Sequence, residues 1–258
     1  MKYFRNLVSL DKIKAKVTKT DSGKIIVFTD FDGTITIKDI GDELFIEMGQ
    51  FEPFHSDLIN GKINIQEYWK SLCSSLGSKI TKEIIERYAL NQAIDPYFAN
   101  FADFCSTSGI NLVILSDGFD SYIKPIIKSI SKNGIKIVSN KMIFQPNTAP
   151  VPIFPLSSES CHCLCASCKR NGMLNEADLE SIFVYIGDGY SDFCAAEHAD
   201  IIFAKDRLAA HCTKNKIPYH NFRNFDDILQ KFKTITVKKR IKIRNQAYLN
   251  RTKAIIFE

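Results

Sequence analysis

Long apolar runs are missing from this chain of 258 residues. No stretch reaches the roughly eighteen consecutive apolar residues that a membrane-spanning helix requires. Residues 1–24 do contain apolar side chains, but charged residues interrupt them every few positions. We therefore expect neither a membrane span nor a secretory signal, and we expect a cytoplasmic protein that does not bind membranes.

Strong charge of one sign is also missing, except at the C-terminus. The formal net charge is +5, but residues 234–258 hold seven basic residues and one glutamate, which leaves 27 basic and 28 acidic residues elsewhere. Such a tail could bind nucleic acid or anionic lipid, but its alternating Ile and Val residues also suit an edge strand or a docked terminal segment. We favour the second interpretation, so nucleic acid is not an expected partner. The sequence leaves the oligomeric state open.

Hydrophobic residues make up 45% of the chain and charged residues 24%, the balance of an ordinary globular protein. Short, continuous, β-branched apolar runs recur, and they are typical of strands buried on both faces of a parallel sheet. Segments with a helical period separate these runs, so the sequence predicts an α/β fold with a doubly wound parallel sheet. The expected strands are 24–30, 111–117, 135–140, 181–188 and 199–204, and the expected helices of this part are 96–108, 119–132, 191–198, 206–216 and 224–233.

The connection between the first two expected strands is far longer than the others. Three amphipathic segments in it, 38–49, 64–76 and 81–91, predict an inserted helical cap. Residues 145–155 hold four of the eight prolines and predict an extended loop. The expected domains are residues 1–37 and 110–233 for the core, 38–109 for the cap, whose last helix could belong to the core, and 234–258 for the basic C-terminal segment.

Polar side chains follow the apolar runs at the points where the strands should end. Asp30 and Asp32 come at the end of the first run, Ser116 and Asp117 at the end of the second, and Asp188 at the end of the fourth. Ligands of open parallel sheets bind at this edge. Neighbouring carboxylates repel each other, so a pair two residues apart indicates a bound cation or shared catalytic work. Any one of these residues alone would be read as a turn or helix cap.

These residues also resemble the motifs of a known superfamily. The stretches "DFDGT" (30–34), "LSDG" (115–118) and "GDGYSD" (187–192), with Lys169 before the last, resemble the four ordered motifs of the haloacid dehalogenase superfamily. The resemblance covers about residues 24–230, and the long first connection is similar to its helical cap. The sequence looks closest to the methylthiopentenyl phosphate phosphatase branch, with phosphoethanolamine/phosphocholine phosphatases and phosphoserine phosphatase-like proteins as near relatives.

The resemblance implies a Mg²⁺-dependent phosphatase that acts on a small phosphorylated metabolite. In that pattern Asp30 attacks phosphorus and forms an aspartyl phosphate, while Asp32 protonates the leaving group and then activates water. Asp30, the backbone carbonyl of Asp32 and Asp188 would hold Mg²⁺. Asp192, one helical turn after Asp188, would be a ligand or the partner of one.

The phosphate needs donors for the charge that develops on its oxygens. Ser116, the amides of the turn that contains Gly118, and the charged Lys169 would supply them. Asp117 is assigned to the same site, where it would face the cap and read a polar group of the substrate. A turn aspartate that caps the next helix is an equally good interpretation.

Cysteine is concentrated in one place, with four of the eight between residues 161 and 168. A cytosolic chain seldom clusters thiols for disulfides, so a tetrahedral Zn²⁺ site and a set of free or redox-active thiols are the open alternatives. Because Lys169 follows directly, either state would affect its position. The cluster consists of Cys161, Cys163, Cys165 and Cys168, with His162 among them.

The sequence therefore predicts hydrolysis of a small-molecule phosphomonoester. A phosphotransferase or mutase on the same scaffold, or a non-catalytic zinc-stabilised binding protein, are the alternatives. The cap should choose the substrate, and its candidate side chains are Asp39, Asp42, Glu43, Phe45, Tyr68 and Trp69. We assign no functional role to the lone histidines His55, His198, His211 and His220.

Overall fold

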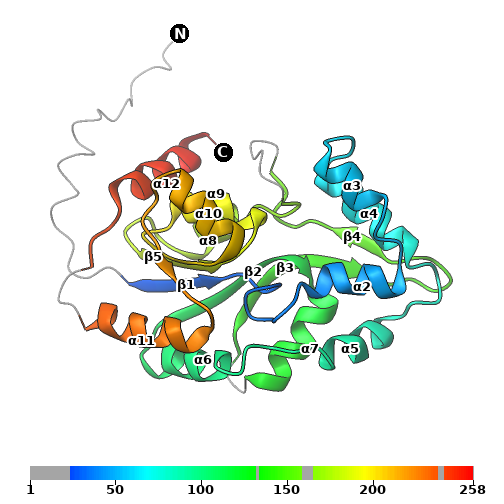
Figure 1. The fold of residues 1–258 in the computed structure, drawn as a ribbon, viewed down its shortest axis with the longest axis horizontal. Helices are drawn as coiled ribbons and strands as arrows, with labels where there is room; N and C mark the ends of the chain where they lie inside the picture. The colour runs from blue at the N-terminus through cyan, green and yellow to red at the C-terminus, as the bar shows by residue number, and fades with distance from the viewer. Residues whose placement is uncertain (1–23, 132–133, 159–164, 238–240, 258) are drawn as a thin grey trace, which may run out of the picture.

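A seven-stranded sheet forms the centre of the computed structural model, which describes residues 24–131, 134–158, 165–237 and 241–257 (Figure 1). The strand order is β4-β3-β2-β1-β5-β6-β7, and neighbours are parallel except β3 and β4. The chain order reverses at β1, as in doubly wound folds. The strands are β1 Ile25–Thr29, β2 Asn111–Phe119, β3 Lys136–Ile143, β4 Val151–Ile153, β5 Ile182–Gly187, β6 Ile201–Ala204 and β7 His220–Asn221.

Helices cover both faces of the sheet (Figure 1). Val27 and Phe28 are both completely buried, because successive side chains of a strand point to opposite faces and each face has its own core. Val27 shares its core with Phe101 and Phe225, whereas Phe28 shares the other core with Met173. The helices of the first face are α6 Phe98–Thr107, α7 Asp120–Ile130 and α11 Phe225–Thr236, and those of the second are α8 Lys169–Glu176, α9 Phe193–His198 and α10 Asp206–Lys214.

The segment between β1 and β2 is helical. Its first helix, α2, begins after Asp39, whose carboxylate accepts a hydrogen bond from Asp42 N at 2.8 Å. A capping box of Asn64 and Glu67 starts α4. The last helix, α6, packs against β2 and α11, so it lies in the layer of core helices. The other helices of this segment are α2 Ile40–Met48, α3 Phe54–Ile59, α4 Ile65–Ser75 and α5 Lys82–Leu90.

The predicted fold class, a doubly wound parallel sheet with an inserted helical cap, is confirmed. All of the expected strands and helices are present, with ends that differ by a few residues. A three-residue helical turn, η1 Tyr190–Asp192, precedes α9. Residues 145–155 are not wholly a loop, because they contain β4. An edge strand tolerates Pro152, since one side of such a strand needs no N–H donors.

Of the two alternatives for the C-terminal segment, an edge strand or a docked terminal segment, the described residues show the second, because residues 245–257 form a docked helix. Helix α12 (Asn245–Phe257) packs against α9. Ala247, Arg251 and Ala254 are its buried side chains, spaced four and three residues apart, as one face of a helix requires. The alternating Ile and Val residues lie before this helix. Within the described ranges no helix is both long and apolar enough to span a membrane.

Candidate active site

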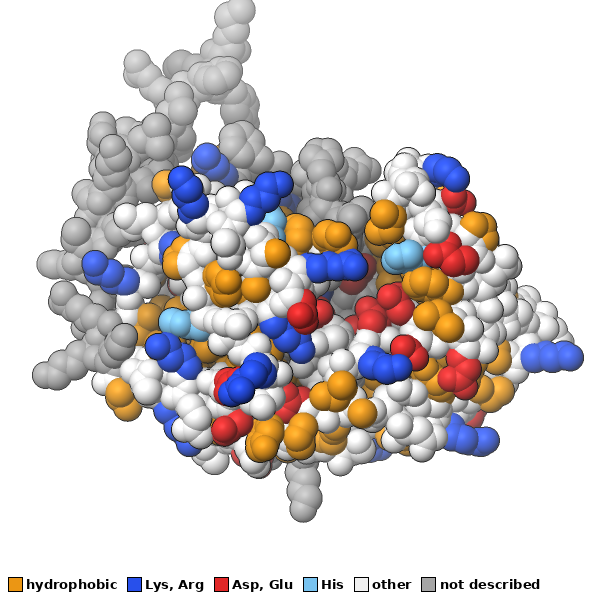
Figure 2. Space-filling model, viewed as in Figure 1, with side chains coloured by type: hydrophobic (Ala, Val, Ile, Leu, Met, Phe, Trp, Pro, Cys, Tyr) orange, Lys and Arg blue, Asp and Glu red, His pale blue; other side chains and the backbone are white. Residues whose placement is uncertain are grey.

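The side chains that the motifs single out gather at the carboxyl ends of β1, β2 and β5. Asp30 and Asp32 follow β1, Ser116 lies near the end of β2, and Asp188 follows β5. They line a cavity of about 340 Å³, whose other walls come from α2, α3, α4 and the start of α10. Figure 2 shows the hollow from outside, with acidic side chains gathered around it.

Asp30 is buried at the end of β1. Its Oδ1 atom lies 2.6 Å from Lys169 Nζ and accepts a hydrogen bond from Phe31 N at 2.7 Å. Burial raises the pKa of Asp30, and the Asp192 carboxylate raises it further, whereas the Lys169 ammonium lowers it. Both of these contacts involve Oδ1, so Oδ2 is the Asp30 oxygen with fewer bonds to break before it can react.

Lys169 begins α8 and is only 2% exposed. Besides Asp30, its ammonium contacts Asp192 Oδ1 at 2.7 Å. Burial alone would lower the pKa of Lys169, but the Asp192 and Asp30 carboxylates raise it above its ordinary value, so the side chain is charged. One ammonium between two carboxylates leaves this cluster with an excess of negative charge.

Asp192 uses both of its oxygens on protein donors. Oδ1 accepts the Tyr185 hydroxyl at 2.6 Å in addition to Lys169, and Oδ2 accepts the amides of Asp188 and Gly189, each at 2.9 Å. The carboxylate is completely buried. Asp192 therefore fixes the turn that carries Asp188.

Asp188 completes a group of three carboxylates. Ligand oxygens of Asp30, Asp188 and Asp192 all lie within 4.8 Å of one another, and in the described part of the chain no other group of this kind could hold a metal ion. Burial, followed by the charge of Asp192, raises the pKa of Asp188 to about 6, while a hydrogen bond from Thr34 lowers it. An all-oxygen set of this kind fits a hard divalent cation such as Mg²⁺.

Asp32 has a different surrounding from Asp30. Its Oδ2 atom accepts the Tyr122 hydroxyl at 2.8 Å and lies 3.4 Å from Ser116 Oγ, and its Oδ1 atom accepts Ile40 N at 3.1 Å. Burial, followed by the charge of Asp39, raises the pKa of Asp32 to about 8, and the bonds from Tyr122 and Ile40 lower it. A raised pKa favours the protonated form of the Asp32 carboxyl, which is the form that a general acid needs.

Two glycines allow these groups to approach each other. Gly33 has φ +70°, a left-handed conformation that favours glycine, and a Cβ there would lie 2.7 Å from Asp188 Oδ2. At Gly118 a Cβ would collide with the Tyr122 hydroxyl and the Asp32 carboxylate. The amide of Gly118 donates to Ser116 Oγ at 2.9 Å, so it orients this hydroxyl.

Asp117 is largely occupied by the protein itself. Its Oδ1 atom accepts the amides of Ala166 at 2.8 Å and Ser167 at 2.9 Å, and its Oδ2 atom accepts Trp69 Nε1 at 3.3 Å. Asn140 also donates to Oδ1, at 3.2 Å. Asp117 thus holds the segment before Lys169 and joins it to the cap, and it reaches the cavity at its wall.

The cysteine cluster lies partly outside the described residues. Cys161 and Cys163, with His162, belong to the segment 159–164, which is not described. Cys168 is buried and Cys165 is half-buried. The group of possible metal ligands found in the described ranges is made of aspartates, so the zinc hypothesis has no support there.

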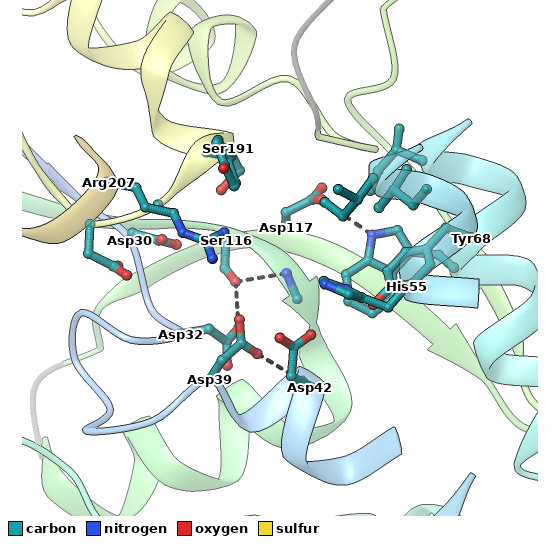
Figure 3. Close-up of a pocket in the computed structure, with 18 of the residues that line it drawn as sticks. Asp30, Asp32, Asp39, Asp42, His55, Tyr68, Ser116, Asp117, Ser191 and Arg207 are labelled. Carbon is teal, nitrogen blue, oxygen red and sulfur yellow. Dashed lines mark hydrogen bonds between the residues drawn. The ribbon is translucent and has the colours of Figure 1, made fainter. Parts of the chain in front are cut away.

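The rest of the cavity wall comes mainly from the cap (Figure 3). Of the candidates named from the sequence, Asp39, Asp42, Tyr68 and Trp69 line it. Phe45 is buried in the core instead, and Glu43 pairs with Lys38 at the surface. The far wall is apolar or aromatic, with Leu58, Ile59 and Ile65 beside the two aromatic residues.

Among the wall residues to which no role was assigned from the sequence are Tyr122, Arg207 and His55. Tyr122 lies in the first turn of α7, directly after β2, and its hydroxyl reaches Asp32. Arg207 follows β6 at the same sheet edge as the other strand-end residues, and its guanidinium lies over the Tyr190 ring at 4.5 Å. His55 also lines the cavity, although we had assigned it no role, and no spacing signal identifies it because α3 was not predicted.

This fold and this strand-end cluster define a phosphatase of the haloacid dehalogenase superfamily. Residues 25–221 match the model of a family described as Putative Phosphatase, and the chain belongs to that family. The match ends before α11 and α12.

The chain is also similar to several known proteins in sequence or in fold. The chain is 28% identical over 211 residues to 2-hydroxy-3-keto-5-methylthiopentenyl-1-phosphate phosphatase of Brevibacillus brevis, covering 81% of this chain and 95% of the relative. It is 29% identical over 215 residues to Pdp3-interacting factor 1 of Schizosaccharomyces pombe, covering 80% and 93%. A phosphoserine phosphatase structure with a phospho-aspartyl intermediate analogue has the same fold, with a TM-score of 0.63 at 17% identity, covering 81% of this chain and 99% of that one.

Proposed function

We propose that the protein hydrolyses a small-molecule phosphomonoester through an aspartyl phosphate on Asp30, with Asp32 as the acid and base and with Mg²⁺ as cofactor. The observation that carries the proposal is the contrast between the two aspartates after β1. Asp30 is paired with the ammonium of Lys169 at 2.6 Å, whereas Asp32 accepts hydrogen bonds from neutral donors. A nucleophile needs the first environment and a general acid needs the second.

The first step would form a bond between a carboxylate oxygen of Asp30 and phosphorus. The contacts with Lys169 and Phe31 fall on Oδ1, so Oδ2 is the attacking oxygen in this proposal. Ser116 Oγ would donate to a phosphate oxygen, and Lys169 would offset the charge that gathers near Asp30. As the bond from phosphorus to the leaving oxygen breaks, Asp32 would give that oxygen a proton.

The second step would return Asp30 to its starting state. Asp32, now ionised, would take a proton from a water molecule whose oxygen attacks phosphorus while the bond between phosphorus and Asp30 Oδ2 breaks, which releases inorganic phosphate. The Tyr122 hydroxyl and the Ile40 amide hold the Asp32 carboxyl in place through both steps. One residue can therefore serve as acid and then as base.

Asp30 and Asp188 fit Mg²⁺ as direct ligands, because Asp192 already uses both oxygens on protein donors. The backbone carbonyl of Asp32 would join them. When bound, the ion would offset the repulsion between the phosphate dianion and the attacking carboxylate. We expect EDTA to remove activity and added Mg²⁺ to restore it.

The leaving group would contact the cap wall. That wall is apolar and aromatic at its far end, so it suits a leaving group with an apolar end. Several relatives are named for 2-hydroxy-3-keto-5-methylthiopentenyl-1-phosphate, a compound with a thioether tail, which we propose as the first substrate to test.

A phosphate-release assay tests the proposal. Purified protein would be offered this compound, phosphoserine, phosphoethanolamine and a nucleoside monophosphate, each with Mg²⁺ and with EDTA. Transfer of phosphate to an added alcohol in place of water would favour the phosphotransferase alternative. Absence of phosphate release from every compound with Mg²⁺ present would reject the proposal.

A further inference from the structure

The C-terminal segment beyond the family match holds one end of helix α9. Arg244 donates from Nη2 to the carbonyls of Ala196 and Glu197, both at 2.7 Å, and from Nε to the carbonyl of Ala199 at 3.0 Å. Asn250 and Arg251 add bonds to the carbonyls of Glu197 at 3.1 Å and His198 at 2.6 Å. Side chains distant in sequence thus bond four consecutive carbonyls, those of residues 196–199.

This arrangement supplies what α9 lacks. The helix has only six residues, too few to be stable alone, and the last four carbonyls of any helix have no partner within it. The segment bonds three of these, on residues 196–198, and the carbonyl of Ala199, the residue directly after the helix, whose amide also donates to the Ala196 carbonyl. The carbonyl end of a helix also carries partial negative charge, which the two guanidinium groups offset. The segment therefore acts as a C-terminal cap supplied from elsewhere in the chain.

Asp200 ties the same segment to the sheet. Its carboxylate accepts Phe183 N at 2.9 Å and Arg244 N at 3.0 Å, and it pairs with Arg251 Nη1 at 3.1 Å. Arg251 is completely buried, with its guanidinium over the Phe183 ring at 4.3 Å. Burial of a charged side chain is costly unless it is paired, so this network specifies where the segment docks.

The other end of α9 leads into the active site. Asp192 is the residue directly before the helix, and its carboxylate holds the amides of Asp188 and Gly189. On its side, α9 packs against α8, whose first residue is Lys169. A shift of α9 would therefore move Asp192 directly and Lys169 through α8.

We propose that Arg244 and Arg251, with Asn250, are positioning residues for the active site, and that they act through α9 on Asp192 and Lys169. None of the three lines the cavity. The kinetic part of this inference rests on the proposed function, whereas the placement of Asp192 can be measured without any substrate.

The test compares Arg244→Ala with Lys253→Ala. Lys253 is an exposed residue of α12, so its replacement changes the charge of the segment without touching α9. We expect Arg244→Ala to lower kcat/KM by about 10- to 100-fold, since a small misplacement of catalytic groups costs that much, and Lys253→Ala to leave it unchanged. Arg244→Lys should recover part of the loss, because an ammonium can bond fewer carbonyls than a guanidinium.

A second readout is hydrogen exchange of the amides of Asp188 and Gly189, which donate to Asp192. In the absence of substrate and metal, we expect faster exchange at these amides in Arg244→Ala and no change in Lys253→Ala. Faster exchange confined to residues 196–200 and α12, with full kcat/KM, would overturn the proposal and leave the segment as a stabilising element only.

If Arg244→Ala fails to fold, Asn250→Ala provides a milder version, since it removes a single bond to the Glu197 carbonyl. A smaller change in exchange at residues 188 and 189 is then expected, and its absence in a folded variant would count against the proposal. If no phosphomonoester is hydrolysed by the unmodified protein, the proposed function fails, while the exchange experiment still decides whether the segment positions Asp192.

Discussion

Two buried ion clusters lie at the two ends of α9, and they differ in what they leave free. At the N-terminal end, Lys169 stands between Asp30 and Asp192, with an excess of carboxylate. At the C-terminal end, Asp200 pairs with the Arg251 guanidinium and accepts the Arg244 amide, while the Arg244 guanidinium bonds helix carbonyls instead. The first cluster lines the cavity through Asp30, whereas in the second the guanidinium groups donate hydrogen bonds to the carbonyls at the end of α9.

The comparison shows how the same physical cost serves two purposes. Burying a charge is unfavourable unless partners surround it. In the cluster of Asp200 the charges are paired, and the need for this pairing fixes the position at which the C-terminal segment packs on the core. The Lys169 cluster is left short of positive charge on the side of the cavity, so it can attract a cation. Removal of the cation from each cluster tests this difference directly, and three further experiments test Asp30, Asp32 and His198.

The largest effect is expected at Asp30. Asp30→Asn should lower turnover by about 10³-fold or more, because an amide cannot form the acyl phosphate. The fold should persist, since Lys169 keeps its partner Asp192. Phosphate release would be measured alongside circular dichroism, and normal turnover by the folded variant would reject Asp30 as the nucleophile.

Removing the cation from each cluster should destabilise the protein unequally. Lys169→Met leaves two buried carboxylates without their partner and should cost about 3–5 kcal/mol. Arg251→Met should cost less, because it removes the cation from one buried carboxylate, that of Asp200, and not from two. Urea unfolding in EDTA at pH 7 gives the loss of unfolding free energy in each variant. An equal or larger loss in Arg251→Met would show that the carboxylates of the Lys169 cluster depend no more on their cation than Asp200 does.

Asp32→Asn should slow hydrolysis by about 10²-fold, as loss of a general acid and base usually does. The effect should shrink with a substrate such as p-nitrophenyl phosphate, whose leaving group needs no proton. Steady-state kinetics on an alkyl and an aryl ester measure the difference. Because hydrolysis of the aspartyl phosphate is common to both esters, the comparison uses kcat/KM, and the same loss of kcat/KM on both esters would exclude Asp32 as the acid.

The smallest effect concerns His198, at the C-terminal cluster. Burial lowers the pKa of His198 to about 4, although a hydrogen bond to the Cys194 carbonyl opposes the shift. Because the unfolded state binds a proton more readily, this stability is complete above about pH 6.5 and is lost as the pH falls towards 4. Unfolding free energy should fall by about 2 kcal/mol from pH 8 to pH 5 through this residue. The fall should be absent in a folded His198→Asn variant, and its persistence there would assign it to other groups.

Much of the fold could be predicted from the sequence because its signals are local. The apolar runs of β1 and β5 have no polar alternation, and a strand buried on both faces is the usual cause of that pattern. The positions of Asp30, Asp32, Ser116 and Asp188 followed from the rule that parallel strands end at one edge. Helix α12 was not predicted because its buried face contains Arg251. A hydrophobicity pattern assigns an arginine to the exposed face of a helix.

The sequence by itself determined the fold class, the strand-end residues and the superfamily, since these depend on apolar periodicity and on short motifs. Only the tertiary structure decided which donors the Asp192 carboxylate accepts and that the Tyr122 hydroxyl bonds Asp32. It also decided that Asp117 bonds the segment before Lys169 and that Arg251 is buried against Asp200. Such contacts join residues far apart in the chain, for example Arg251 to Asp200. No local pattern encodes them, because a polar side chain has the same sequence signature whether its partner is water or a buried charge.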